Sequence, residues 1–337
     1  MSLRSVMERH LNAIWYGGDR RPPLAYRGLA ALHRRLGRAN ARRPAARPAV
    51  PVVVVGNLCA GGSGKTPVVM AIARALANDR RVAVISRGYG GRAGRYPLAV
   101  EADTPVGACG DEALLIRLAT GLPVFVDPVR SRALQQAIRA ADAEIVVSDD
   151  GLQHRGLPRS FEVCLFDGRR GVGNGRLLPA GPLRQPLSRL NEVDQILIKG
   201  QGMDWPGAER FELEVIGLRP LGEWQARGAP QGPPGQFLEA WRGRAVSAVC
   251  GLADPGQFKD MLERQGLRVH LRVFPDHHRY RPADLEGLAG PVLTTAKDAV
   301  KLGAWAEQLD IRVLEVEARL PENFLQRIGR HIEGFEP

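Results

Sequence analysis

Four valines, a glycine-rich turn and a helical pattern follow one another in residues 52–76, and this feature constrains the fold most. Residues 52–55 are consecutive valines, which is typical of a strand buried on both faces of a sheet. The turn at residues 56–66 reads GNLCAGGSGKT, and helical periodicity continues from Thr66 to Leu76. A buried strand that leads through such a turn into a helix predicts the first unit of a parallel α/β sheet.

The glycine-rich turn has the chemistry of a phosphate-binding loop. Lys65 can reach the terminal phosphates of a nucleotide, and the Thr66 hydroxyl can bind Mg²⁺. Cys59 stands where the standard eight-residue pattern has glycine, but strand, turn and helix occur in the expected order. The backbone amides expected to point at phosphate oxygens are those of Gly61, Gly62, Ser63 and Gly64.

The alternation of strands and helices continues beyond this turn. Strands are expected at residues 82–86, 124–126, 145–147, 162–166 and 195–199, and helices at 111–119 and 129–140. This alternation predicts a doubly wound parallel sheet of the P-loop NTPase kind, and a βαβ pattern at 245–274 predicts a second, smaller α/β domain. The expected division is a basic amphipathic segment at 1–50, a core domain at 51–200, a linker at 201–236 and a C-terminal domain at 237–337.

Two pairs of adjacent carboxylates are the candidate metal and base residues. Asp149 and Asp150 follow an apolar strand at the sheet edge where ligands of α/β proteins bind. We expect this pair to hold Mg²⁺, directly or through water. Asp111 and Glu112 begin a predicted helix and could serve as base and metal ligand. A capping role is the alternative for both pairs, and for Asp111 it fits the local sequence equally well.

Three further segments gather polar side chains after predicted strands. Residues 274–280 read FPDHHRY, and this density of an acid, two imidazoles, a guanidinium and a phenol favours a site. Residues 127–130 (DPVR) and the proline-rich loop at 174–184 (NGRLLPAGPLR) supply arginines that suit phosphate. The chain has 42 arginines and five lysines, so this bias weakens the argument for any single arginine.

Positive charge is concentrated near the N-terminus. Residues 1–50 contain eleven arginines and two acidic residues, which gives +9 of the formal net charge of +11. Apolar residues at helical spacing in 24–43, with arginines mostly on other faces, predict an amphipathic helix. A helix lying on an anionic membrane fits this pattern, aided by Ile14, Trp15 and Tyr16. An arginine-rich helix packed on the domain fits it equally well.

Composition argues against several other classes of protein. The four cysteines lie far apart without a CxxC pair, so neither a disulfide framework nor a zinc site is indicated. No apolar run approaches the ~20 residues needed to span a bilayer, and we expect a cytoplasmic chain without a signal peptide. A nucleic-acid partner is not expected, because the basic N-terminus is not followed by interleaved aromatic residues.

Seven ordered segments together carry a family resemblance. They are GNL with GGSGKTP in 56–67, SRGYGG at 86–91, GDE at 110–112, SDDGLQH at 148–154, LLPAGPLR at 177–184, FPDHH at 274–278 and TTAKDAVK at 294–301. In order and along most of the chain, these segments resemble the tetraacyldisaccharide 4'-kinase family of lipid A biosynthesis. Gln185 and Ala296 depart from the pattern, because members of the family commonly carry glutamate at both positions.

The resemblance implies transfer of the γ-phosphoryl group of ATP, with Mg²⁺, to the 4'-hydroxyl of an acylated glucosamine disaccharide 1-phosphate, which forms lipid IVA. It implies a peripheral protein on the anionic surface at the cytoplasmic face of the inner membrane, and we expect a monomer. Asp111 would accept the sugar proton and His277 would pair with it, while Lys65 would bind the phosphates. The metal ligands would be Thr66, Glu112, Asp149 and Asp150. The substrate-binding residues would be Arg87, Arg130, Asn174, Arg184 and His278.

Two further expectations concern motion and an alternative function. Because Asp111 and His277 belong to different predicted domains, we expect closure of the second domain over the first to assemble the site. The main alternative is a membrane-recruited ATPase or GTPase switch of the partitioning or metallochaperone kind, whose loops also read GGxGKT. Such proteins usually carry lysine directly before the paired glycines, where this chain has Ala60.

Overall fold

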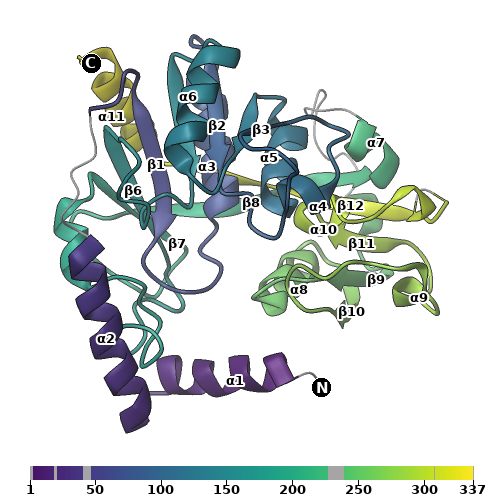
Figure 1. The fold of residues 1–337 in the computed structure, drawn as a ribbon. Coiled ribbons are helices and arrows are strands. Elements are labelled where there is room, and N and C mark those ends of the chain that lie inside the picture. Colours follow the sequence, from purple (N-terminus) through teal and green to yellow (C-terminus); the bar gives the residue numbers. More distant parts are fainter. Residues whose placement is uncertain (1–2, 19–20, 41–46, 227–238, 307, 337) are drawn as a thin grey trace.

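One sheet, which has twelve strands in the described residues, connects the two halves of the molecule (Figure 1). The computed structural model describes residues 3–18, 21–40, 47–226, 239–306 and 308–336. Within these ranges the strand order is β10-β9-β11-β12-β8-β7-β6-β1-β5-β2-β4-β3. The strands after β8 in this order form the core unit, and those before it form a second unit that begins later in the chain.

The core unit is the predicted parallel sheet. Its parallel strands are β1 (Val52–Asn57), β2 (Val82–Ser86), β4 (Val124–Val126), β5 (Ile145–Asp149), β6 (Phe161–Asp167) and β7 (Gln195–Lys199), and β3 (Leu98–Val100) pairs antiparallel at the edge. All four valines of β1 are fully buried: Val53 and Val55 belong to one apolar core, and Val52 and Val54 to another. The strand is apolar throughout because both faces of the sheet are covered.

Helices cover the two faces of this sheet. α3 (Lys65–Leu76), α5 (Asp111–Thr120) and α11 (Glu322–Glu333) contribute to the core that contains Val53 and Val55, and the short α4 (Val106–Cys109) leads into α5. α6 (Arg130–Ala140) packs on the opposite face. Helices on both sides of a parallel sheet confirm the predicted doubly wound α/β fold of the P-loop NTPase kind.

The second unit is a smaller α/β arrangement. It contains β9 (Ala245–Cys250), β10 (Arg268–Val273), β11 (Val292–Thr295) and β12 (Ile311–Arg319), with helices α7 (Leu221–Ala226), α8 (Pro255–Arg264), α9 (Pro282–Leu285) and α10 (Ala296–Ala299). These four strands run parallel to their neighbours within the unit. Phe258 and Leu262 of α8 pack with Val246 and Ala248 of β9 in a core of their own. Short 3₁₀ helices also occur in the described residues, at Leu187–Glu192 in the core unit and at Glu239–Trp241 and Ala304–Ala306 in the second unit.

β8 (Glu209–Pro220) joins the two units. It runs parallel to β7 and antiparallel to β12, so the sheet is continuous across the junction. This strand and α7 lie in the segment 201–236 that the sequence predicted as a linker, of which 227–236 falls outside the described residues. The helix α11, expected in the C-terminal domain, returns to the core unit, where Arg327 donates to Gln195 Oε1 at 2.6 Å. The domain boundaries themselves stay a prediction.

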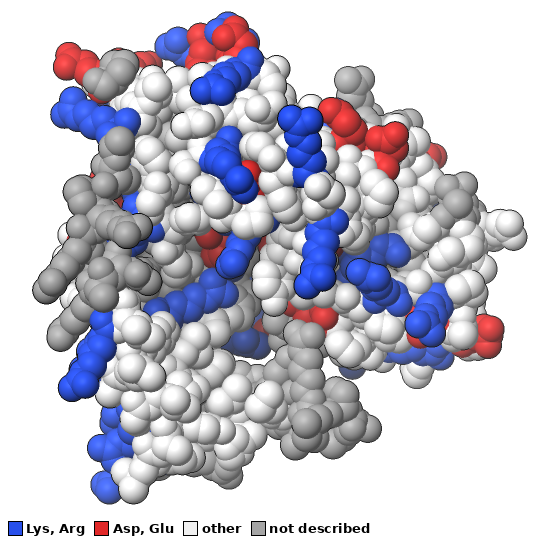
Figure 2. Space-filling model, viewed as in Figure 1, with Lys and Arg blue, Asp and Glu red and all other residues white. Residues whose placement is uncertain are grey.

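Two helices, α1 (Leu3–Tyr16) and α2 (Leu24–Asn40), precede the sheet and lie at the lower edge of Figure 1. Residues 41–43 of the predicted helix 24–43 lie outside the described residues. Four leucines of α2, Leu24, Leu29, Leu32 and Leu36, are 53–78% exposed. Figure 2 shows basic side chains along the lower left edge, where α2 lies in Figure 1. Among the described helices, none has both the length and the apolar character to cross a bilayer.

The end of α1 corrects one expectation. Ile14 and Trp15 were predicted to meet a lipid boundary, but both are buried against the protein. Trp15 Nε1 donates to the Pro179 carbonyl at 3.0 Å, and the Trp15 carbonyl accepts from the Asn174 amide at 2.8 Å. The indole therefore anchors α1 to the proline-rich loop.

Candidate active site

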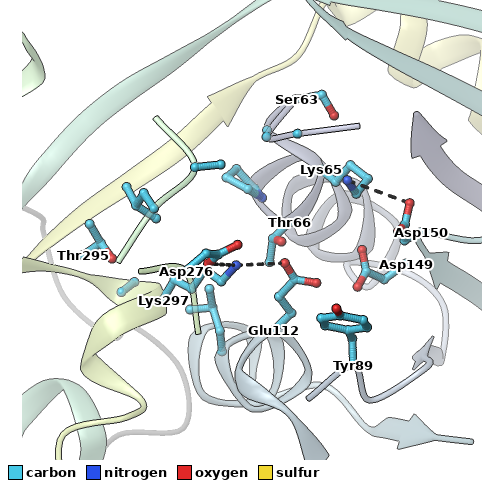
Figure 3. Close-up of a pocket in the computed structure, with 18 of the residues that line it drawn as sticks. Ser63, Lys65, Thr66, Tyr89, Glu112, Asp149, Asp150, Asp276, Thr295 and Lys297 are labelled. Carbon is cyan, nitrogen blue, oxygen red and sulfur yellow. Dashed lines mark hydrogen bonds and ion pairs between the residues drawn. The ribbon is translucent and has the colours of Figure 1, made fainter. Parts of the chain in front are cut away.

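A cavity of about 900 Å³ lies between the core unit and the second unit. The core unit contributes the phosphate turn and the carboxyl ends of β2 and β5, and the second unit contributes α8, the turn after β10 and the start of α10. Figure 3 shows the side chains of Thr66, Glu112 and Asp149 directed into one space. The cavity therefore stands at the sheet edge where ligands of α/β proteins bind.

The phosphate turn has the backbone that glycine alone adopts readily. Gly61 has φ 114°, and Gly64 has φ 78° where it caps the N-terminus of α3. All four predicted amide donors, together with Lys65 and Thr66, line the cavity. Lys65 Nζ lies 3.8 Å from Asp150 Oδ1. The turn therefore presents backbone amides and a lysine charge to the cavity at the beginning of a helix, which is an arrangement suited to phosphate.

Asp149 is buried at the end of β5 and is only partly satisfied. Its Oδ2 accepts from Ser86 Oγ at 3.3 Å, whereas Oδ1 has no hydrogen-bond partner among the described residues. Burial, together with the charges of Glu112 and Asp150, raises the pKa of Asp149 well above its ordinary value. A cation beside Oδ1 would relieve both the repulsion and the missing contact.

Asp150 has the opposite environment. Burial alone would raise its pKa, but the charges of Lys65 and Arg184 hold it below its ordinary value. Arg184 NH1 donates to Asp150 Oδ2 at 3.1 Å. Its neighbour Asp149 is therefore the aspartate with an oxygen left for a metal, while Asp150 is already paired with cationic side chains.

Thr66 and Asp149 fit a magnesium ion that is bound partly by the protein and partly by phosphate oxygens. In the described ranges, no three His, Cys, Asp or Glu side chains are arranged to enclose a metal by themselves. Mg²⁺ at nucleotide sites does not need such an enclosure, because phosphate oxygens and water supply most of its ligands. The donors that the chain offers are the Thr66 hydroxyl, which lines the cavity, and the unpaired oxygen of Asp149.

Asp111 and His277 are in direct contact across the two units. Asp111 is 3% exposed at the start of α5, and its Oδ2 lies 2.8 Å from His277 Nδ1. Burial alone would raise the pKa of Asp111, but the hydrogen bond from His277 and the charge of Lys297 lower it. The same hydrogen bond raises the pKa of His277. The contact is already formed, so domain closure is not needed to bring these two side chains together.

The turn after β10 fixes the imidazole. His277 has φ 62°, a left-handed backbone that histidine adopts more often than most residues. Its ring packs against Tyr89 with the ring centroids 5.2 Å apart. His278 points elsewhere: it stacks on Phe274 and its Nε2 lies 2.9 Å from Asp284 Oδ2. The structure therefore places His277, not His278, beside Asp111.

The predicted substrate-binding residues divide into two groups. Arg87, Arg130 and Arg184 line the cavity, whereas Asn174 and His278 do not. Asn174 instead supports the fold, since its Nδ2 donates to the carbonyls of Ile14 and Ala180. Arg130 is 2% exposed, and its NH2 donates to the Asp149 carbonyl at 2.8 Å. Arg130 therefore holds the end of β5 in place.

Sequence reasoning missed two lysines that line the cavity. Lys297 Nζ lies 3.3 Å from Glu112 Oε1 and 3.1 Å from Asp276 Oδ1, so it joins the two units beside the Asp111–His277 pair. Lys199 Nζ lies 2.6 Å from Asp167 Oδ2. A signal was present: of five lysines in a chain with 42 arginines, three line this cavity. In a chain whose positive residues are mostly arginine, the lysines in this cavity indicate places where a compact ammonium fits better than a guanidinium.

Comparisons with known proteins agree with this geometry. A family model, LpxK: Tetraacyldisaccharide-1-P 4'-kinase, matches residues 23–333. The tetraacyldisaccharide 4'-kinase of Alcanivorax borkumensis is 44% identical over 330 residues, 96% of this chain and 97% of its own. That of Alkalilimnicola ehrlichii is 45% identical over 324 residues, 92% of each chain.

A solved structure extends the agreement to the fold. The crystal structure of an "apo" form of LpxK from Aquifex aeolicus in complex with ATP has a TM-score of 0.73 and 28% identity to this chain, and the match covers 90% of this chain and 98% of that one. Sequence relatives, family model and fold therefore coincide over nearly the whole length, and the chain belongs to the tetraacyldisaccharide-1-P 4'-kinase family.

Proposed function

We propose that this chain transfers the γ-phosphoryl group of ATP to the 4'-hydroxyl of a tetraacylated glucosamine disaccharide 1-phosphate, which gives lipid IVA. The observation that carries the proposal is the 2.8 Å contact between Asp111 and His277 beside a cavity lined by a phosphate turn. A nucleotide switch needs no carboxylate and imidazole supplied by two separate units of the chain. The identity of the acceptor comes from the names of the relatives and the family.

In this reaction Asp111 is the proton acceptor. The sugar oxygen attacks the γ-phosphorus, its proton passes to Asp111 Oδ, and the bond from the γ-phosphorus to the bridging oxygen of ADP breaks. The lowered pKa of Asp111 means that the carboxylate is ionised, and therefore able to accept, at neutral pH. His277 holds the carboxylate through Nδ1 and shares the proton charge. A base positioned in this way contributes ~10²- to 10⁴-fold in rate.

The phosphate turn would bind the phosphates of the nucleotide, and the carboxylates would bind its magnesium ion. The amides of the turn and Lys65 would bind the phosphates. Thr66 and Asp149 would hold magnesium, with Glu112 and Asp150 in contact with its water shell. When bound, Mg²⁺ neutralises charge on the transferring phosphoryl group and the leaving phosphate. Arg87 and Arg184, which line the cavity, would pair with anionic groups of the substrates.

The proposal includes a peripheral, monomeric protein at the cytoplasmic face of the inner membrane. The acylated acceptor resides in a bilayer, so the cavity must approach an anionic surface. Exposed leucines of α2 and its exposed arginines, Arg27, Arg34 and Arg35, supply apolar and electrostatic attraction to such a surface. The two members of the proposed dyad come from one chain, so no second copy is needed for it.

One assay tests the reaction. The purified chain is mixed with ATP, Mg²⁺ and mixed micelles that contain tetraacyldisaccharide 1-phosphate, and both ADP and the phosphorylated lipid are quantified. We expect ADP to form only with the acceptor present and in equal amount to the product. ATP turnover that does not depend on the acylated disaccharide would contradict the proposal and favour the alternative of a nucleotide switch.

A further inference from the structure

Arg170 lies where the N-terminal helix, the phosphate turn and the second unit meet. It follows β6, and its amide donates to the Asp167 carbonyl at 3.2 Å. Its NH2 lies 3.6 Å from Asp254 Oδ2 of the second unit. Its guanidinium carbon stands 5.8 Å from the centre of the Tyr16 ring at the end of α1. None of these contacts is part of the proton-transfer pair or the metal donors.

The guanidinium also lies against the phosphate turn. A Cβ atom added at Gly61 would stand 3.2 Å from Arg170 NH1, closer than ordinary van der Waals contact. Gly61 is therefore glycine for two reasons: its φ of 114° and the space that Arg170 fills. The Gly61 carbonyl accepts from Asn57 Nδ2 at 3.3 Å. The peptide of Gly61 is held between the end of β1 and this arginine.

Both partners of Arg170 are themselves fixed. Tyr16 is the last residue of α1, where Trp15 and Ile14 are tied to the proline-rich loop by hydrogen bonds to Pro179 and Asn174. Because the helix end cannot slide on this loop without breaking these bonds, the Tyr16 ring is a fixed surface for the guanidinium. A cation over an aromatic ring is attracted by the electrons of the ring face, and more strongly where water is excluded.

On the other side, Asp254 belongs to a chain of polar contacts that crosses the junction. It caps α8 by accepting from the Gln257 amide at 3.3 Å. Gln257 Oε1 accepts from Lys199 Nζ at 3.0 Å, and Lys199 pairs with Asp167 at 2.6 Å. Asp167 accepts from the amide of Arg170, so the contacts form a closed ring. The ring includes residues of both units and borders the cavity.

We propose that Arg170 is a positioning residue for the nucleotide. Its side chain connects α1 and the start of α8 to the peptide of Gly61 in the phosphate turn. Its planar group packs on Tyr16, pairs with Asp254 and fills the space beside Gly61, which no other charged side chain does equally well. The position of α1, the helix next to the membrane-facing α2, is thereby coupled to the affinity of the chain for ATP. The inference rests on the proposed function for the identity of this nucleotide.

The test is binding of a non-hydrolysable ATP analogue with Mg²⁺ to the full chain, measured by calorimetry. Arg170→Met should weaken binding about fivefold or more, the lower end of ordinary coupling between sites. Arg170→Lys keeps the charge without the planar group and should restore only part of the loss. The matched control is Arg169→Met: Arg169 also pairs with a carboxylate of α8, Asp260 at 3.5 Å, but both side chains are about half exposed. This control should bind like the wild type.

A second pair of variants tests the coupling to α1. Tyr16→Leu removes the ring beneath the guanidinium and should weaken binding, whereas Tyr16→Phe keeps the ring and should not. In the Arg170→Met background, Tyr16→Leu should have little further effect, because both changes remove the same contact. Full additivity of the two losses would contradict the coupling.

The outcomes separate this inference from the proposed function. If Arg170→Met binds the analogue like the wild type, or if Arg169→Met loses as much, the inference is overturned. If Arg170→Met does not fold by circular dichroism, Asp254→Asn takes its place, since it keeps the cap of α8, removes the paired charge and should show the same direction of loss. A wild type that binds the analogue but does not phosphorylate the lipid would contradict the proposed function alone.

Discussion

The position of Asp111 depends on the glycine before it. Gly110 has φ 86°, and a Cβ atom there would lie 2.4 Å from the Tyr89 carbonyl oxygen. Glycine is therefore required for the sharp entry into α5, and Asp111 becomes the first, buried residue of that helix. At that place Asp111 Oδ2 contacts His277 Nδ1, while Oδ1 accepts from the Glu112 amide at 3.0 Å, so one carboxylate oxygen meets the imidazole and the other satisfies an amide of the first helical turn.

Asp111→Asn should remove the proton acceptor without changing the size of the side chain. We expect kcat to fall ~10²- to 10⁴-fold, with affinity for an ATP analogue within about twofold of wild type. Steady-state kinetics with the acylated acceptor measures the first, and calorimetry the second. The control is Asp103→Asn, an exposed aspartate outside the cavity, which should have wild-type kcat. Near-normal turnover in Asp111→Asn would falsify its role as base.

The contact of His277 with Asp111 should make stability depend on pH. The hydrogen bond raises the pKa of His277 above its ordinary 6.5, so the folded state binds the proton more tightly than the unfolded state. The stabilisation is fully present below pH 6.5 and is lost as pH rises through the raised value. Urea unfolding at pH 6 and pH 9 should therefore show a larger stability difference between wild type and His277→Gln at pH 6. An equal stability difference at the two pH values would contradict this linkage.

At the scale of elements, local patterns predicted most of the fold. The strands at 82–86, 124–126 and 195–199 and the helix beginning at Asp111 occur where expected, because alternation and helical periodicity are properties of short segments. The partners of β8 and the return of α11 were not predictable, since no local pattern says which distant strand or core an element meets. The burial of Trp15 was missed for the same reason: an aromatic residue near a basic helix suits a protein surface as well as a membrane.

The same scale shows which of the expected site residues the structure brings to the cavity or beside it. The phosphate turn, Asp111, His277 and the carboxylates after β5 were predictable because glycine, lysine and acidic residues at strand ends carry specific chemistry. Asn174 was expected in the site from the family resemblance, but its side-chain amide donates to the carbonyls of Ile14 and Ala180 and so connects α1 with the loop itself. Lys297 lies in the TTAKDAVK segment that carries the resemblance, but it was given no role, because the sequence does not show that its ammonium meets Glu112 of the other unit.

α2 carries the prediction that belongs to this scale. Leu29→Ser, Leu32→Ser and Leu36→Ser together remove apolar surface that is more than half exposed, so they should leave the fold intact. A fully buried leucine contributes about 1.5–3 kcal/mol, and the triple change should lower partitioning onto anionic vesicles at least about tenfold. Co-sedimentation measures this. The control is Leu309→Ser, an exposed leucine of the second unit; equal binding of triple variant and wild type would remove α2 as the anchor.

At the scale of the whole molecule, the two units share both a sheet and an apolar core. β8 pairs with a strand of each unit, and the core that contains Val53 also contains Val249, Val313 and Phe324. This continuity explains how a carboxylate and an imidazole can meet although they come from units that begin far apart in the sequence. The shared sheet and core hold Asp111 and His277 at hydrogen-bonding distance, which the proposed proton transfer requires, since a misplacement of about 1 Å can reduce rates by 10²-fold.

The Lys297 ammonium connects the two units beside the cavity. Its removal tests whether the alignment of the two units controls the rate of phosphoryl transfer. Lys297→Met removes the cation that pairs with both Glu112 and Asp276, so the second unit should shift from the core unit and the pKa of Asp111 should rise. We expect kcat to fall on the order of 10- to 100-fold, with a lower melting temperature. Lys297→Arg should restore much of both. Lys259→Met, which breaks a surface pair with Glu263, should change neither; a Lys297→Met variant with wild-type kcat would show that the ammonium is dispensable for alignment.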